Sequence, residues 1–378
     1  MSFLSGLPHY AVSFLVVLTV LVFFHELGHF WVARRNGVRV ETFSIGFGPE
    51  LFGFTDRLGT RWKFSLLPLG GYVKMFGEAD TLLTPDGQER VLTAAERAVS
   101  FAQKRVGQRA AIVLAGPLAN FVLAIVLLGG LFAIYGKPYL ANIVGEVQPG
   151  TAAEAAGIRP GDRIVEVNGQ HVDRFEDIAV IVRLGLDAPL DLVIERDGRE
   201  IRLTAHPTVQ EDIDVFGNKQ RIGLLGIRPA GESGVIRYDP ASAVWEAAQE
   251  TWRMTAGTLT ALGQIVSGTR PAEELGGVLR IAKASGDVAS AGLAALVSFA
   301  ALLSVNLGLI NLFPIPMLDG GHLAFYAIEA ARGRPLGPRA QEWGFRIGLA
   351  LVLSLMVFAT WNDLVSLKVL AYLKNLVT

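Results

Sequence analysis

Two histidines four residues apart, with a glutamate beside the first, form the most distinctive pattern of this chain, His25-Glu26-Leu27-Gly28-His29. On a helix this spacing places both imidazoles on one face, one turn apart, where they suit two ligand positions of Zn²⁺. The glutamate is then placed to act as general base on the hydrolytic water. The pattern predicts one Zn²⁺ per chain, held by His25 and His29, with Glu26 as the catalytic residue.

The setting of this motif sharpens the prediction. Residues 11–33 are apolar, and no Lys, Arg, Asp or Glu precedes Glu26. Ionisable side chains at membrane depth are costly, so their presence points to a functional site. A chance match would leave three polar side chains inside a membrane helix without partners. We therefore expect a metal site within the membrane, nearer the Arg34 end of this segment.

The composition is that of a membrane protein. Of 378 residues, 51% are hydrophobic and 18% are charged. A helix needs about 20 apolar residues to cross a bilayer, and four segments qualify or come close: 11–33, 110–135, 288–318 and 347–362. The net charge of −1 gives no electrostatic basis for nucleic-acid binding. Because the chain has no Cys, histidines and carboxylates must supply the ligands of a metal.

Residues 38–76 follow a different pattern from the apolar segments around them. Apolar and polar side chains roughly alternate, β-branched and aromatic residues are frequent, and segments 46–49 and 68–71 contain glycine and proline. This pattern predicts β-hairpins, either associated with the membrane or forming an ordinary surface sheet. Residues 78–109 are polar and predict short helices.

Residues 139–208 differ abruptly in composition and predict a soluble α+β module. Strands are expected at 142–147, 163–167, 190–196 and 199–205, with helices at 151–156 and 175–184. Asp197-Gly198 between the last two strands is a strong signal for a two-residue hairpin turn. The order of elements resembles a bacterial, circularly permuted PDZ domain, a fold that binds extended peptides by strand addition. Its ligand is unknown, and a pure spacer is the alternative.

Residues 209–286 are predicted to link this module to the C-terminal membrane part at 287–378. One strand is expected at 222–228. From Asp239, a helix N-cap candidate, to Ser267, apolar residues including Trp245 and Trp252 recur at helical spacing. Such a helix could lie at a membrane interface or pack against the preceding module.

Basic residues predict the orientation. One basic cluster, Arg34, Arg35 and Arg39, follows the first apolar segment. A second, Lys104, Arg105 and Arg109, precedes the second segment, and a third, Arg332, Arg334 and Arg339, lies between the third and fourth segments. All three fall on one side, which the positive-inside rule makes cytoplasmic. Both termini and the module at 139–208 then face the periplasm, and the chain is expected to be a multi-pass protein of the bacterial inner membrane.

A catalytic zinc of this kind takes three protein ligands and keeps one position open. The run Asn311-Leu312-Phe313-Pro314-Ile315-Pro316-Met317-Leu318-Asp319-Gly320-Gly321-His322 closes the third apolar segment. Asp319 is expected at the level of the two histidines, so it is the predicted third ligand, with His322 as a competitor. The amide of Asn311 could hold a scissile peptide or its developing oxyanion, or satisfy backbone groups freed by Pro314.

The paired motifs, H-E-x-x-H in a first membrane helix and N-x-x-P-x-P-x-L-D-G in a later one, resemble the site-2 protease family. Segments 43–48 and 69–75, with the inserted PDZ module, are similar to its bacterial regulator-of-sigma-E protease branch. The resemblance implies zinc ligation by His25, His29 and Asp319 and catalysis by Glu26. It further implies a membrane-embedded β region where unwound substrate pairs as an added strand. The substrate-binding residues so implied are Asn311, Gly46, Phe47, Gly48, Gly70, Gly71 and Asn120.

Two features depart from that branch. Many members carry two PDZ modules, whereas this chain shows one, and Gly276-Gly277-Val278 stands where the branch tends to have Gly-Pro before an aliphatic residue.

We predict a polytopic α-helical membrane protein that hydrolyses peptide bonds in or near transmembrane segments. The resemblance implies single-span substrates, such as anti-sigma factors of stress responses or leftover signal peptides. A catalytically inert PDZ-bearing membrane scaffold is the main alternative, and the intact Glu26 argues against it. An ordinary zinc protease facing the periplasm is disfavoured by the basic-residue topology.

Overall fold

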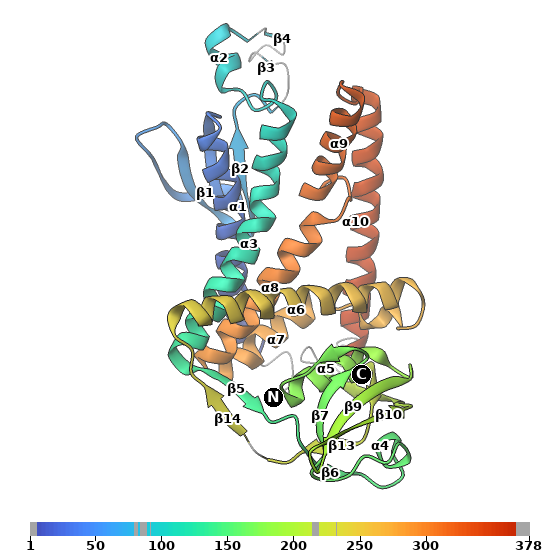
Figure 1. Ribbon diagram of the computed structural model, residues 1–378. Coiled ribbons are helices and arrows are strands. Elements are labelled where there is room, and N and C mark those ends of the chain that lie inside the picture. Colours follow the sequence, from blue (N-terminus) through green and yellow to red (C-terminus); the bar gives the residue numbers. More distant parts are fainter. Residues whose placement is uncertain are drawn as a thin grey trace, which may run out of the picture. The chain divides into compact units, whose positions relative to one another are not determined.

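The computed structural model describes residues 6–78, 82–83, 89–90, 92–213, 219–231 and 233–367. The chain forms two compact units (Figure 1). One, here called the membrane unit, comprises Met1–Leu128 and Gly277–Thr378, and the other, the inserted unit, comprises Gly129–Gly276.

Four helices among the described residues are long and apolar enough to cross a membrane. They are α1 (Leu7–Arg35), α3 (Val106–Tyr135), α8 (Leu293–Leu312) and α10 (Pro338–Ser366). Large apolar side chains of α10, such as Ile347, Leu351 and Val357, stay exposed, as expected for a helix surrounded by lipid. The prediction of a multi-pass membrane protein is confirmed.

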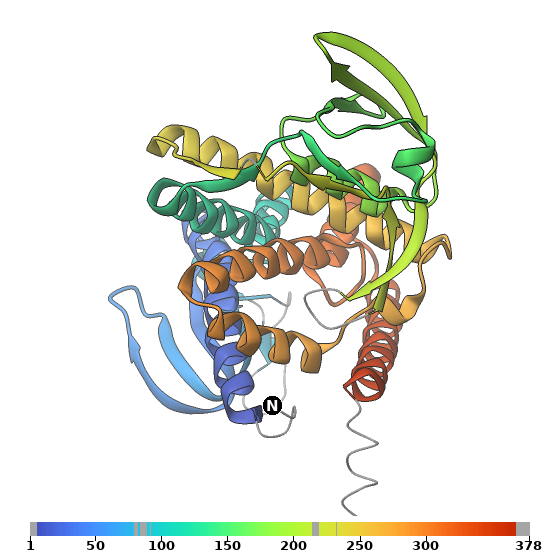
Figure 2. The ribbon, with the colours of Figure 1, turned by 90° about the horizontal axis from the view of Figure 1, so that it is seen from below.

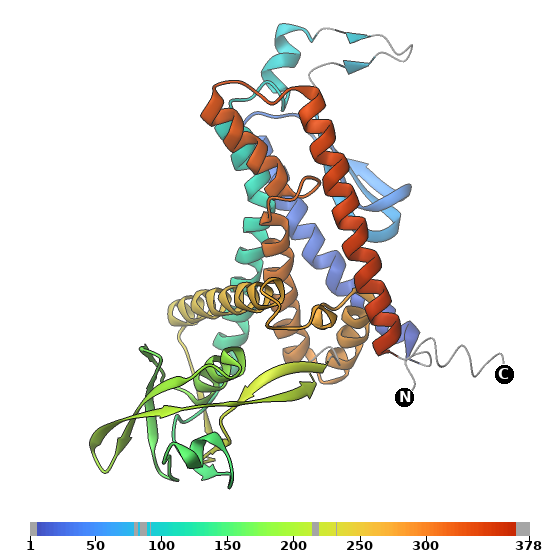
Figure 3. The same cartoon turned by 90° about the vertical axis from the view of Figure 1, so that its right-hand side faces the viewer.

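The third span is shorter than the predicted 288–318. Helix α7 (Val278–Ser290) ends before Gly292, whose φ of 111° is one that other residues rarely adopt, and α8 begins after it. Pro314 and Pro316 cannot continue a helix, so α8 ends at Leu312 and α9 (Asp319–Arg332) starts after a short loop. Helix α10 extends beyond the predicted 347–362 at both ends and runs beside α9 (Figure 3).

Strands β1 (Val40–Thr55) and β2 (Arg61–Met75) form one long, bent antiparallel pair rather than separate hairpins. Ile45 of β1 pairs with both Phe64 and Gly71 of β2, and Phe64 pairs with both Ile45 and Phe52. Each strand is therefore bent so that two of its parts flank the same part of the other strand. The glycine- and proline-containing segments 46–49 and 68–71 therefore lie at bends inside the two strands. The inner part of the pair packs against α1 and α3 through Phe43 and Met75.

The segment between β2 and α3, where short helices were expected, contains one short helix and two short strands among its described residues. These are β3 (Leu82–Leu83), β4 (Glu89–Arg90) and α2 (Ala94–Val99). Thr93 and Glu96 form a capping box at the start of α2.

The inserted unit is built around a four-stranded sheet in the order β10-β9-β7-β8. Its strands are β7 (Arg163–Val167), β8 (Gln170–His171), β9 (Leu190–Arg196) and β10 (Arg199–Ala205). Helices α4 (Ala152–Ala155) and α5 (Phe175–Gly185) complete its core, in which Ile164, Ile178 and Ile194 are buried. The predicted Asp197-Gly198 turn joins β9 and β10, with positive φ at both residues.

The predicted division at 139–208 and 209–286 differs from this unit because later strands pair with earlier ones. Strand β13 (Ile227–Pro229) pairs with β6 (Val144–Val147), and β14 (Ser233–Ile236) pairs with β5 (Lys137–Leu140). Strands β11 (Thr208–Ile213) and β12 (Lys219–Leu224) form a long ribbon (Figure 2). Residues 209–276 are thus part of one folded unit with 139–208.

Helix α6 (Pro240–Val266) starts at the predicted cap, where the Asp239 side chain accepts hydrogen bonds from two backbone N–H groups. A 3₁₀ turn, η1 (Ala272–Glu274), follows it. Trp245 and Trp252 are largely exposed, whereas Ala243 and Ala247 are buried on the opposite face. The helix itself contacts the preceding module, as one of the two expectations had it, because the Gln264 side chain donates to the Leu184 carbonyl of α5 and Glu246 pairs with Arg174.

Candidate metal centre

The structure brings together the two histidines of α1 and the aspartate that begins α9. Nε2 of His25 lies 3.2 Å from Nε2 of His29 and 3.2 Å from Oδ2 of Asp319. Nε2 of His29 lies 3.5 Å from the same carboxylate oxygen. One ligand atom of each residue lies within 4.8 Å of the others, a grouping able to hold a metal ion.

Glycines allow α3 to approach α1 closely enough to build this grouping. A Cβ atom at Gly28 would lie 2.2 Å from the carbonyl oxygen of Ala115. A Cβ atom at Gly116 would lie 2.2 Å from Nε2 of His29. Because real Cβ atoms do not approach so closely, a side chain at either position would force the two helices or the imidazole apart.

A backbone hydrogen bond orients the ring of His29. Its Nδ1 lies 2.9 Å from the carbonyl oxygen of Ile112, in α3. A carbonyl can only accept, so Nδ1 carries the hydrogen and, in the neutral ring, Nε2 presents a lone pair. That lone pair faces Oδ2 of Asp319, which is buried and has no hydrogen-bond partner. Two electron-pair donors facing each other without a proton between them fit a cation placed among them.

The loop before α9 holds Asp319 in place through unusually close backbone contacts. A Cβ atom at Gly320 would lie 2.2 Å from the carbonyl oxygen of Phe313, and one at Gly321 would lie 2.4 Å from that of Ile315. The D-G-G sequence thus lets the start of α9 fold back on the proline loop. Met317 has a φ of 95°, a strained value for a residue with a side chain.

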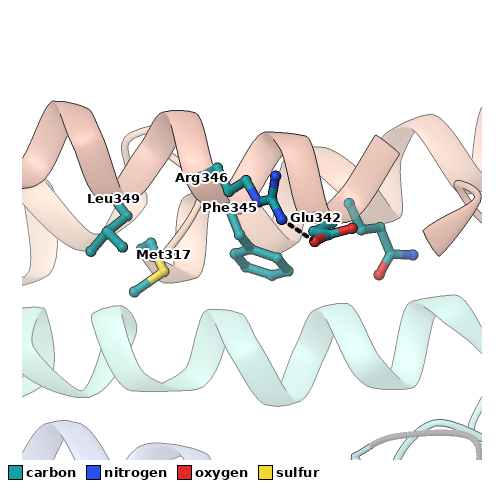
Figure 4. Close-up of a pocket in the computed structure, with 6 residues that line it drawn as sticks. Met317, Glu342, Phe345, Arg346 and Leu349 are labelled. Atoms are coloured by element: carbon teal, nitrogen blue, oxygen red, sulfur yellow. Dashed lines mark hydrogen bonds and ion pairs between the residues drawn. The ribbon is translucent and has the colours of Figure 1, made fainter. Parts of the chain in front are cut away.

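Helix α10 covers the same loop from another side. A Cβ atom at Gly348 would lie 1.9 Å from the carbonyl oxygen of Pro316. A cavity of about 430 Å³ lies beside this contact, lined by Met317, Gln341, Glu342, Phe345, Arg346 and Leu349 (Figure 4). It shares Met317, Gln341 and Phe345 with the cavity at the histidines.

A larger cavity of about 790 Å³ opens at the three converging side chains. Glu26 lines it together with His25, His29 and Asp319, next to residues 71–73 of β2. A Cβ atom at Gly71 would lie 3.1 Å from Cγ of Glu26, so this glycine lets the strand pass close to the glutamate. The Glu26 carboxylate, the three residues able to hold a metal ion and a β-strand thus meet at one cavity.

The predicted substrate-binding residues separate into three groups. Asn311 and Gly71 line the cavity. Gly46, Phe47, Gly48 and Gly70 lie at the bends of β1 and β2 and do not line it; the Phe47 ring packs beside Gly70. Asn120 is fully buried behind His25. His322, the competing ligand candidate, lines the cavity beside Phe345 but is not in the metal grouping.

Comparison with known proteins identifies the family. The model of peptidase family M50 matches residues 13–355. The chain belongs to this family. M50 members are site-2 proteases, so the predicted family and the predicted zinc metalloendopeptidase activity are confirmed.

Relatives match this M50 chain over nearly its whole length. A protein of Agrobacterium fabrum named as a zinc metalloprotease is 48% identical, covering 97% of both chains. The metalloprotease MmpA of Caulobacter vibrioides is 39% identical, covering 97% of this chain and 98% of its own. The protease RseP of Yersinia pestis is 36% identical, covering 93% and 97%.

Two contributions to the M50 site escape reasoning from sequence. The Ile112 carbonyl leaves no signal because every residue has one. The role of Gly116 shows only once the helices are placed, although a glycine on a second apolar helix can indicate close approach to a neighbouring helix.

Proposed function

We propose that this M50 protease works inside the membrane, with His25, His29 and Asp319 as its zinc ligands and Glu26 as its acid–base residue. The observation that carries the proposal is the convergence of these four side chains on one cavity, from α1 and the start of α9. Two histidines and one carboxylate make a three-ligand set of the kind found in catalytic zinc sites.

The chemistry divides between the metal and the chain. Bound zinc supplies a Lewis acid that polarises the scissile carbonyl and makes water more acidic. Glu26 takes the proton of the attacking water and delivers it to the leaving amine. Asn311, whose amide donates to the Leu307 carbonyl at 3.0 Å and borders the cavity, helps to position the substrate.

A helical substrate must unwind before it can be cut, because its backbone groups are hydrogen-bonded internally. In β2, residues 71–75 pair with β1 on one edge, while Gly71, Tyr72 and Val73 line the cavity. An unwound segment added along β2 would replace the lost hydrogen bonds and bring its peptide bond beside Glu26. The substrates expected are single-span membrane proteins, such as anti-sigma factors or signal-peptide remnants.

The test of this assignment separates metal binding from catalysis. Purified Glu26→Gln should keep its zinc and lose cleavage of a model single-span protein. Asp319→Ala, His25→Ala and His29→Ala should lose zinc as measured by metal analysis, and His322→Ala should keep it. Near-normal cleavage by Glu26→Gln would refute the proposed acid–base residue, and the same result would be incompatible with an inert scaffold.

We further propose that the inserted unit is a PDZ module facing the periplasm of an inner-membrane protein. The order of β6, α4, β7, α5, β9 and β10 and the basic clusters support this. Its peptide ligand is undetermined, and both termini lie outside the described residues. In intact cells, Cys introduced at Asp187 should react with an impermeant reagent and Cys at Arg334 should not. The reverse pattern would overturn the orientation.

A further inference from the structure

A second intramembrane amide, Asn120, lies beside the proposed metal site but away from its cavity. Asn120 belongs to α3, and its side chain has no exposed surface. Its amide nitrogen lies 3.2 Å from Nδ1 of His25. It does not line the cavity that His25, Glu26 and Asn311 share. A residue so placed can touch a metal ligand and cannot touch a substrate.

The chemistry of the imidazole sets what His25 needs from this neighbour. Nε2 of His25 points toward Asp319 and His29, so Nε2 is the nitrogen that would bind the metal. A neutral imidazole that binds a metal through Nε2 carries its hydrogen on Nδ1. Because this Nδ1–H group is buried, it requires a hydrogen-bond acceptor. Histidines that bind metals ordinarily find that acceptor in a neighbouring protein group.

The amide of Asn120 can meet this need because it carries both a donor and an acceptor. Its oxygen, Oδ1, is buried and has no hydrogen-bond partner. A half-turn of the amide about its terminal bond exchanges the oxygen and the nitrogen, which places Oδ1 against Nδ1 of His25. The amide nitrogen can donate to a His25 ring whose Nδ1 carries no hydrogen. The amide oxygen can accept from the Nδ1–H of a His25 ring that binds a metal through Nε2.

Helix α8 holds Asn120 at this position. The hydroxyl of Ser304, itself fully buried, donates to the backbone carbonyl of Asn120 at 2.8 Å. One turn further along, a Cβ atom at Gly308 would lie 2.9 Å from the Pro117 carbonyl and 3.2 Å from Cβ of Asn120. Close packing of α8 against α3 thus fixes the amide beside the imidazole.

We infer that Asn120 is a positioning residue that orients His25 for zinc. This inference rests on the proposed function, since it takes His25 as a ligand. The two histidines are then held in the same way from α3, His29 by the Ile112 carbonyl and His25 by a side chain. The sequence places Asn120 and Asn311 together among substrate-binding residues, and the structure gives them different tasks.

The test compares full-length Asn120→Leu, Asn120→Asp, Asn311→Leu and His25→Ala with the unchanged chain. Zinc affinity is measured in detergent by competition with a chelator, and the geometry of the ligands by the visible absorption of the Co²⁺-substituted protein. Asn120→Leu, of similar volume but unable to accept, should bind zinc about 10–100-fold more weakly. Asn311→Leu should keep its zinc affinity and lose cleavage.

Asn120→Asp distinguishes orientation of His25 from a purely structural role. An ionised carboxylate can only accept, so it favours the ring form with hydrogen on Nδ1. Asn120→Asp should therefore bind zinc at least as tightly as the unchanged chain and shift the Co²⁺ absorption. This variant also decides the matter if Asn120→Leu does not fold.

Three results separate failure of this inference from failure of the proposed metal site. Unchanged zinc affinity in folded Asn120→Leu, or an unshifted Co²⁺ spectrum in Asn120→Asp, would overturn the role of Asn120 alone. Unchanged zinc affinity in His25→Ala would overturn the ligand assignment itself.

Discussion

Gly116 in α3 leaves the space that the imidazole of His29 in α1 occupies. A Cβ atom at Gly116 would lie 2.2 Å from Nε2, 2.4 Å from Cε1 and 2.9 Å from Cδ2 of that ring. The ring cannot simply move aside, because Nδ1 is held by the Ile112 carbonyl of the same helix. The position of one proposed ligand therefore depends on the absence of a side chain on a different helix.

Gly116→Ala should weaken zinc binding even though it adds a single methyl group. The methyl group meets the ligand nitrogen and must displace the ring, so we expect a loss of metal affinity of about 10–100-fold, as for disturbed supports of a metal ligand. Chelator competition on the purified protein measures it.

Gly130→Ala is the matched control for this substitution. It lies in the same helix, and a Cβ atom there would meet nothing within 4 Å. Because alanine favours a helix over glycine by about 1 kcal/mol, this variant should keep zinc and be no less stable. Equal zinc affinity in the two variants would show that His29 tolerates displacement.

Asp363→Ala should destabilise the membrane unit. Asp363 in α10 is fully buried and accepts hydrogen bonds from the side chain of Arg280 and from the backbone N–H groups of Gly277, Leu279 and Arg280 at the start of α7. The substitution removes the buried carboxylate that Arg280 and three backbone N–H groups share, and breaking a buried ion pair costs about 3–5 kcal/mol. Unfolding in detergent micelles measures the change.

Asp287→Ala serves as the control because its carboxylate is on the surface. Asp287 pairs with Lys283 along α7, and surface pairs contribute at most about 1 kcal/mol. If Asp363→Ala were no more harmful than Asp287→Ala, the buried pair would not anchor α10.

The stability of the inserted unit should fall in acid through Asp162. Burial by itself would raise the pKa of this carboxyl, but hydrogen bonds from Arg196 and the Arg159 N–H outweigh burial and lower it. A lowered folded-state pKa means that the stabilisation is complete above the unfolded pKa of about 3.9 and is lost as pH falls through the folded value.

Asp162→Asn should remove about 1.5–3 kcal/mol of this stability at neutral pH, as expected for hydrogen bonds to a charged group, and flatten its acid dependence. Hydrogen exchange at the Ile164 and Ile194 amides of the full-length protein, followed from pH 7 downward, measures the stability of the inserted unit and its dependence on pH. Glu200→Gln, on an exposed position of β10, should leave the profile unchanged. An identical acid profile in Asp162→Asn would assign the loss to other groups.

Local pattern was enough to predict the helices and strands whose side chains follow one period. The bounds of β7, β9 and β10 and the cap of α6 follow from alternation, a D-G turn and an Asp N-cap. The H-E-x-x-H and L-D-G motifs predicted which residues would meet. The pattern predicted strands in β1 and β2 but not that each is one long bent strand, because a glycine that bends a strand resembles one that ends it. Contacts made by backbone atoms, such as that of the Ile112 carbonyl, cannot be predicted from residue type, because every residue has the same carbonyl group.

The described residues of the inserted unit, 129–213, 219–231 and 233–276, take no part in the proposed chemistry, which makes the unit a candidate gate. Every residue that lines the two cavities lies in the membrane unit, as does the whole metal grouping. Strand β5, near the start of the unit, pairs with β14, and in this pair Leu140 lies opposite Ser233. We therefore expect it to restrict which substrates reach the site, by excluding those that still carry large periplasmic domains.

Removing residues 141–232 and joining Leu140 to Ser233 through a short Gly-containing turn tests this expectation. The cut keeps the paired strands β5 and β14 and removes β6 together with its partner β13, so no strand is left with half a pair. The variant should retain zinc, cleave substrates with short external segments at the normal rate, and also cleave untrimmed substrates that the full chain rejects. Glu26→Gln in the same background controls for contaminating proteases. If a folded, zinc-loaded variant cut neither class, the inserted unit would be required to bind substrate, and its role as a gate would be wrong.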